Sequence, residues 1–93
     1  MTENVENNKE KHRFEVVSGS QVSKLDYRED ADRLALVHTE VPEELSGQGI
    51  GSALVKTALT YAKDNGKKVL PFCPFVAAYI QRHPEWKDIV LEL

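Results

Sequence analysis

The stretch Ser46-Gly47-Gln48-Gly49-Ile50-Gly51-Ser52 joins an extended apolar run to the strongest helix pattern in the chain. Its glycines allow a tight turn and leave no Cβ in the way of a ligand. The amides at the start of a helix lack intrahelical acceptors, and the helix dipole adds partial positive charge there. A strand, a glycine loop and a helix start therefore predict an anion site, best suited to phosphate. A tight connection that binds nothing is the alternative, and spacing alone does not separate the two.

Composition narrows the class of protein. The chain has 93 residues, 41% of them hydrophobic, a net charge of −3 and one cysteine. This is typical of one small globular domain, and a lone cysteine favours a reducing, cytoplasmic compartment. No basic stripe suggests nucleic acid, no apolar run could span a bilayer, and the acidic N-terminus does not resemble a signal peptide. We expect neither a nucleic acid nor a membrane partner.

The first part of the chain predicts a tail and a hairpin. Residues 1–11 are polar and are expected to be disordered, which leaves 12–93 as a single domain. A first strand is expected from near His12, where Phe14 and Val16 alternate with polar residues, and a second over roughly Gln21–Arg28. The turn signal Ser18-Gly19-Ser20 between them predicts a β-hairpin.

The best strand pattern runs from Arg33 to Val41 and ends at Pro42. Both sets of alternating residues begin with apolar side chains, so the strand is expected to be central and covered on both faces. One face is expected to carry Leu34, Leu36, His38 and Glu40, and the other Ala35, Val37, Thr39 and Val41.

Helical spacing follows from about Gly49 to Asn65, with Gly66 suited to the left-handed cap conformation. Lys68–Cys73 predicts a strand parallel to the preceding one, reached by a right-handed crossover. Pro71 inside it predicts an edge position or a separation from its neighbour. A short helix over Pro74–His83 and a last strand over 88–93 complete an α+β (α/β) fold.

His38 and Glu40 are candidate general bases. They lie two apart on a strand, about 7 Å along it, on one face. Such a pair can serve one pocket. The alternative is a hydrogen-bonded core histidine beside a solvated glutamate. His12 and His83 show no ligand spacing with His38 or Cys73, so no metal site is expected.

Cys73 and Tyr79 are candidates for nucleophile and acid. Cys73 lies where a strand ends and a helix begins, and helix-start amides favour a thiolate. Tyr79 follows on that helix, and its hydroxyl could protonate a leaving thiolate. Each has a structural alternative, a buried apolar cysteine and a core aromatic residue.

Taken together, Leu36-Val37-His38-Thr39-Glu40-Val41-Pro42, the glycine loop, Pro71-Phe72-Cys73-Pro74-Phe75 and His83-Pro84-Glu85-Trp86 resemble the minimal-length, YjdJ-type members of the GNAT N-acetyltransferase superfamily. The resemblance covers residues 12–93. It implies a truncated GNAT-like fold, with a mixed antiparallel and parallel sheet, a long helix after the third strand and a short helix after the fourth.

The resemblance also implies roles for the site residues. Acetyl-CoA would be the acetyl donor, with no metal. Amides from Gly47 to Gly51 would bind its diphosphate, and the strand edge would pair with its pantetheine arm where the two neighbouring strands splay apart. Tyr79 matches the general acid and Cys73 a cysteine suspected of catalysis. The implied cofactor-binding residues are Thr39, Glu40, Val41, Ser46, Gly47, Gln48, Gly49, Ile50, Gly51 and Ser52.

Two departures from the family pattern bear on function. Ser46 stands where the signature usually has Arg or Gln, and the usual N-terminal helices, which shape the acceptor pocket, are absent. The sequence thus predicts an acetyl-CoA-dependent N-acetyltransferase that acts on a small-molecule or peptide amine as a monomer or weak dimer, with a protein partner as one way to complete the acceptor site. The alternative is a CoA or acetyl-CoA sensor or interaction module with little turnover.

Overall fold

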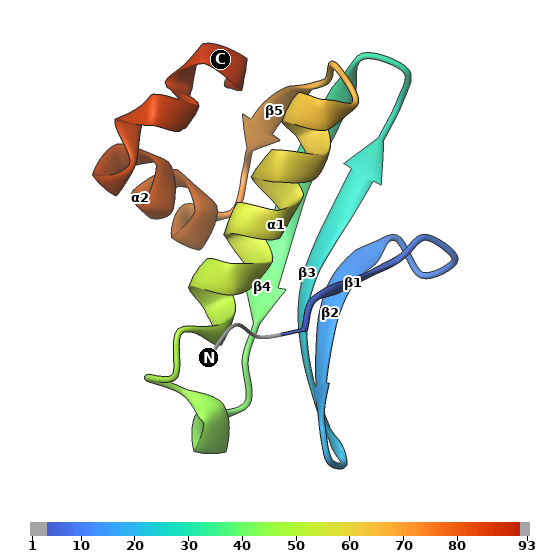
Figure 1. Ribbon diagram of the computed structural model, residues 1–93, viewed down its shortest axis with the longest axis vertical. Coiled ribbons are helices and arrows are strands. Elements are labelled where there is room, and N and C mark those ends of the chain that lie inside the picture. Colours follow the sequence, from blue (N-terminus) through green and yellow to red (C-terminus); the bar gives the residue numbers. More distant parts are fainter. Residues whose placement is uncertain (1–3, 92–93) are drawn as a thin grey trace.

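One mixed sheet forms the frame of the computed structural model, which describes residues 4–91 (Figure 1). Its strands follow chain order, β1-β2-β3-β4-β5. Helix α1 runs across the sheet, and α2 lies beside it at the β5 end. The elements are β1 (Glu6–Asn8), β2 (Arg13–Ser18), β3 (Gln21–Glu29), β4 (Arg33–Glu40), the 3-10 turn η1 (Glu43–Leu45), α1 (Ile50–Asp64), β5 (Lys68–Pro71), α2 (Pro74–Arg82) and the 3-10 turn η2 (Pro84–Ile89).

Strand β1 lies within the segment for which the sequence predicts disorder. It pairs antiparallel with β2, with Asn7 opposite Phe14. The hydroxyl of Tyr27 donates a 2.6 Å hydrogen bond to Asn7 Oδ1, and Val5 packs against the core. The structure therefore differs from the expected tail at these positions. The free edge of β2 supplies backbone hydrogen-bond partners to β1, and β1 itself has no apolar alternation from which a strand could be predicted. Residues 1–3 of the expected tail lie outside the described residues.

The hairpin of β2 and β3 and the central strand β4 are confirmed. Both pairs, β2 with β3 and β3 with β4, are antiparallel. Side chains alternate as the period-two pattern predicts, so that one face of the sheet enters the core. The buried residues from these strands are Phe14, Val16, Ser23, Leu25, Tyr27, Leu34 and Leu36.

The crossover to β5 is also confirmed. Gly49 caps α1 in the left-handed region, with φ of 80°, and Gly66 after its end has φ of 66°. Neither backbone conformation suits a residue with a Cβ. Helix α1 buries six residues against the sheet, and β5 then pairs parallel with β4, from Arg33 opposite Lys68 to Leu36 opposite Pro71.

The prediction of a last strand over 88–93 is wrong for the residues that the structure describes. Pro84–Ile89 forms a 3-10 turn instead, which takes in the start of the expected strand. Pairing is reduced to one bridge between Val69 and Val90 and a 2.9 Å bond from the Leu91 amide to the Val69 carbonyl. Residues 92–93 of the expected strand lie outside the described part.

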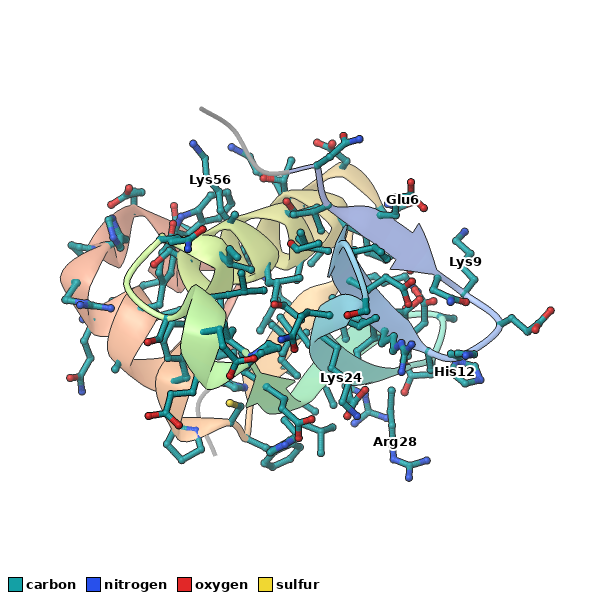
Figure 2. All side chains as sticks on the ribbon, turned by 90° about the horizontal axis from the view of Figure 1, so that it is seen from below. Glu6, Lys9, His12, Lys24, Arg28 and Lys56 are labelled. Atoms are coloured by element: carbon teal, nitrogen blue, oxygen red, sulfur yellow. The ribbon has the colours of Figure 1, made fainter. Side chains whose placement is uncertain are left out.

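Coverage of β4 on both faces is likewise wrong. Leu34 and Leu36 are fully buried, whereas Val37 is 41% exposed. Helices α1 and α2 contribute to one core cluster on a single side of the sheet. In Figure 2, Lys24 and Arg28 of β3 point away from α1, toward the side of the sheet that no helix within residues 4–91 covers. We call this side, with Lys24, Asp26, Arg28, Ala35 and Leu70, the open face. Within residues 4–91, no helix is long and apolar enough to cross a membrane.

Candidate active site and cofactor-binding loop

Strands β4 and β5 separate near the middle of β4. Their pairing stops at Leu36 and Pro71, although β4 continues to Glu40 alongside β3. The Cys73 amide donates a last 3.0 Å bond to the Leu36 carbonyl. Pro71 is the final residue of β5, as expected for a residue that removes a ladder donor. Among residues 4–91, the β5-side edge of β4 therefore has no strand partner from Val37 onward.

A β-bulge at Val37 changes the direction of the side chains in the second half of β4. Leu36 lies opposite Tyr27 and His38 opposite Asp26, so Val37 is an extra residue. An extra residue reverses the alternation beyond it. Thr39, rather than His38, consequently shares the helix-covered face with Leu36.

The predicted face of His38 and Glu40 is therefore wrong, although the two do lie together. They lie on the open face, with His38 Nε2 3.5 Å from Glu40 Oε1 and both side chains more than half exposed. A core role for His38 is ruled out by this exposure. The pair is accessible to a molecule that approaches from the side opposite to the helices.

Cys73 lies at the N-terminus of α2, and its side chain is buried, with 4% of its surface exposed. Its Sγ lies 3.3 Å from Thr39 Oγ1. Burial raises the pKa of the thiol, but hydrogen bonds from the Thr39 hydroxyl and from the amides of Val76 and Phe75 outweigh it. The pKa of Cys73 is therefore lower than that of an ordinary thiol. The site has the polarity that a nucleophilic thiolate needs.

Tyr79 lies on the same helix and is 5% exposed. Its ring stacks on His83, with centroids 4.3 Å apart. Burial, and next the charge of Glu85, raise the pKa of its hydroxyl, against a smaller opposite effect of Arg82. Tyr79 consequently remains protonated at neutral pH, as a proton donor must.

The glycine loop presents a row of free donors. From Gly47 to Ser52, no backbone amide donates to an acceptor in residues 4–91, and the first intrahelical bond runs from the Ala53 amide to the Gly49 carbonyl at 3.0 Å. Gly47, like Gly49, has a positive φ, of 81°. These amides have the arrangement that binds phosphate at helix starts.

A hollow of about 310 Å³ adjoins these amides, and we call it the loop hollow. Most of the predicted cofactor-binding residues line it, but Thr39, Glu40 and Gln48 do not. Two lining residues come from α2 and were not predicted, Phe75 and Arg82. The lining residues are Val41, Leu45, Ser46, Gly47, Gly49, Ile50, Gly51, Ser52, Phe75 and Arg82.

Contact between Gly51 and Phe75 joins α2 to the start of α1. A Cβ on Gly51 would lie 2.8 Å from Phe75 Cζ, closer than packed atoms approach. Gly51 therefore admits an aromatic ring, in addition to any role of its amide. The sequence signal for Arg82 was present, because Phe75 and Arg82 are i and i+7 on one helix and so share a face.

A larger hollow, of about 450 Å³, lies elsewhere, over the open face and the loop before β2. None of the predicted site residues lines it. Its lining consists of Lys11, His12, Asp26, Tyr27, Arg28, Glu29 and Val37. His12 and Arg28 are labelled on this side in Figure 2. No group of three or more metal-ligating side chains occurs among residues 4–91.

Comparison with known proteins agrees with this architecture. The fold resembles the NMR solution structure of a GCN5-like candidate N-acetyltransferase from Staphylococcus aureus, with a TM-score of 0.74 and 23% identity, over 99% of this chain and 91% of that one. At this identity, the likeness concerns the fold alone. Residues 13–89 match the family of GCN5-related N-acetyltransferases. Since that match spans most of the chain, the protein belongs to the GCN5-related N-acetyltransferase (GNAT) family and is a GNAT-type acyltransferase.

Proposed function

We propose that the protein transfers an acetyl group from acetyl-CoA to the nitrogen of a small-molecule or peptide amine. The observation that carries the proposal is the row of unbonded amides from Gly47 to Ser52 beside the separation of β4 from β5. Family membership supports acyl transfer. The identity of the donor is our inference from the family resemblance, and the class of acceptor is likewise our inference.

The donor would extend from the loop hollow to the gap between the strands. Its diphosphate would accept hydrogen bonds from the loop amides, aided by the dipole of α1. The free edge at the end of β4 and the residue after it, Thr39–Val41, offers backbone groups to the amides of a pantetheine arm, in the manner of an added strand. This path ends near Cys73, where Thr39 and the α2 amides supply hydrogen-bond donors.

The acceptor would enter from the open face, where His38 and Glu40 lie. Either side chain could take a proton from the amine, directly or through water. The amine nitrogen then bonds to the thioester carbonyl carbon, and backbone amides at the gap stabilise the oxyanion that forms. The carbon–sulfur bond breaks, and Tyr79 donates the proton that converts the leaving thiolate to free CoA.

A covalent route through Cys73 is the variant mechanism. The Cys73 thiolate would displace CoA from the acetyl group, and the amine would then take the acetyl group from the cysteine sulfur. The lowered pKa of Cys73 favours this route, whereas its burial limits access to the sulfur.

Binding and turnover are separable in one set of assays. Calorimetry with CoA tests the loop, with Gly49→Ala as a variant whose backbone cannot hold a φ of 80° without strain. Release of free CoA thiol over a panel of amines, polyamines and peptides tests transfer. We expect wild type to bind and release thiol, and Tyr79→Phe to bind normally but turn over at least tenfold more slowly. Absence of CoA binding by folded wild type overturns the proposal.

Cys73→Ala distinguishes the two routes. Loss of all turnover, with an acetylated Cys73 trapped in wild type by mass spectrometry, supports the covalent route. Full activity of the variant removes that route and leaves direct attack.

A CoA or acetyl-CoA sensor, or an interaction module, is the second candidate function. The open face favours it, because Val37 remains 41% exposed there, and an exposed apolar side chain suits contact with a partner. Binding of CoA without thiol release for any amine supports this candidate. Restoration of turnover by a protein partner would indicate instead that the acceptor site is completed from outside.

A further inference from the structure

We infer that Arg82 of α2 binds the diphosphate of the acyl donor as the cationic group of the loop hollow. The inference rests on the proposed function and extends it, since it assigns a binding role to a helix outside the glycine loop. It concerns a side chain of α2, whereas the proposed function concerns the backbone amides from Gly47 to Ser52.

The packing of α2 brings Arg82 to the loop. The ring of Phe75 lies against Gly51 in the first turn of α1, so this face of α2 is fixed beside the loop amides. Arg82 is two helical turns further along the same face. Both residues line the same hollow as Gly47, Gly49 and Gly51. Arg82 and the glycines of the loop therefore border one and the same hollow.

The charge around the loop hollow makes Arg82 distinctive. It is the one charged residue that lines the hollow among the described residues. The preceding turn carries two acids, Glu43 and Glu44, and between Val41 and Val55 the sequence has no lysine or arginine. Without Arg82, a doubly charged diphosphate would meet partial charges from amides but no full positive charge.

Ser46 does not supply this group. Its hydroxyl donates a 2.9 Å hydrogen bond to the Glu43 carbonyl and so closes the η1 turn. Arg82, by contrast, is exposed and forms no ion pair within 4.0 Å among residues 4–91, so its charge is available to a ligand. A planar guanidinium suits two phosphate oxygens at once.

The alternative is a purely structural role, because a cation in the last turn of α2 also stabilises the helix dipole. Such a role predicts lower thermal stability for Arg82→Gln and unchanged affinity for CoA. The binding role predicts unchanged thermal stability for Arg82→Gln and a lower affinity for CoA.

Isothermal calorimetry with three ligands tests the inference on wild type, Arg82→Gln, Arg82→Lys and the control Arg28→Gln. The ligands are CoA, dephospho-CoA, which keeps the diphosphate but lacks the 3′-phosphate, and pantetheine, which lacks both. We expect Arg82→Gln to weaken CoA and dephospho-CoA equally, by about tenfold, and to leave pantetheine unchanged. Arg82→Lys should recover part of the loss. Arg28→Gln, which removes an arginine from the open face, should match wild type.

Results other than these would contradict either the assignment of Arg82 or the identity of the group that it binds. Wild-type affinity in Arg82→Gln, an equal loss in Arg28→Gln, or weaker pantetheine binding overturns the assignment of Arg82. A loss confined to CoA overturns the diphosphate as its partner in favour of the 3′-phosphate. If wild type binds none of the three ligands, the proposed function falls together with the inference, whereas normal wild-type binding with an unaffected variant removes the inference alone.

Discussion

Thr39 Oγ1 lies 3.3 Å from Cys73 Sγ, across the point where β4 and β5 part. The contact joins residues 34 positions apart in the chain. It exists because the bulge at Val37 turns Thr39 toward the helices, and because Cys73 caps α2 on the same side of the sheet.

Thr39→Val should raise the pKa of Cys73. Burial already raises this pKa, and the hydroxyl of Thr39 is the largest of the groups that lower it, so its removal favours the thiol. Because the chain has one cysteine, no second thiol contributes to the ultraviolet absorbance of its thiolate, and the raised pKa values of Tyr27, Tyr61 and Tyr79 shift phenolate absorbance to higher pH. We expect the midpoint to move to higher pH in Thr39→Val and to stay unchanged in Thr60→Val, whose hydroxyl bonds to the Lys56 carbonyl. An unchanged midpoint in Thr39→Val would show that the hydrogen bond has no effect on the thiolate.

Gly51→Ala should have opposite consequences in two backgrounds. Alanine inside a helix is favoured over glycine by about 0.5–1 kcal/mol. In wild type, the new Cβ would meet the Phe75 ring at 2.8 Å, so we expect that gain to be cancelled or reversed. In a Phe75→Ala background, the ring is gone and the full gain should appear in urea unfolding.

Gly66→Ala is the matched control for this cycle. Its φ of 66° makes alanine strained in both backgrounds, and a Cβ there meets no atom within 4 Å. Gly66→Ala should therefore lower the free energy of unfolding equally with and without Phe75. An equal gain from Gly51→Ala with and without Phe75 would contradict the packing role of Gly51.

Asn7→Ala should destabilise the protein, although it lies in a segment of polar composition. The variant removes the acceptor of the 2.6 Å bond from the hydroxyl of the buried residue Tyr27, at a cost of about 1 kcal/mol. Asn4→Ala, at an exposed position, should have no effect on the midpoint of urea unfolding. Equal midpoints for both variants, with unprotected amides in hydrogen exchange over Glu6–Asn8, would contradict the pairing of β1 and support a disordered segment there.

Stability should fall at alkaline pH through Tyr61. Its hydroxyl donates a 2.7 Å bond to Glu29 Oε2, and this bond, followed by burial and the charge of Glu29, raises the pKa of Tyr61 to about 12. A group whose pKa is raised on folding contributes stability below its unfolded pKa, about 10, and that contribution is lost as pH rises from about 10 to about 12.

Urea unfolding across this range measures the effect. We expect the decline to be shallower in Tyr61→Phe, which lacks the titrating group, and in Glu29→Gln, which lacks the carboxylate that accepts the bond and repels the phenolate. Identical slopes in wild type and both variants would contradict the coupling.

The sequence by itself determined those features that depend on neighbours along the chain. Period-two alternation specified the β2–β3 hairpin and β4, helical spacing specified α1, and Pro71 and Gly66 specified where regular structure ends. The glycine loop could be proposed as an anion site for the same reason, because its amides and its helix are contiguous in sequence. The face of His38 could not be predicted, since one extra residue at Val37 reverses the alternation and no local pattern marks a bulge.

Only the tertiary structure decided how the site is assembled from distant segments. Strand β1 exists because β2 offers it backbone partners, Thr39 meets Cys73 because of a register shift against β3, and Arg82 reaches the loop because Phe75 packs on Gly51. Each of these depends on pairing or packing between segments that are far apart in the chain. Local propensity specifies an element, but its register and its neighbours are set by the free energy of the whole fold.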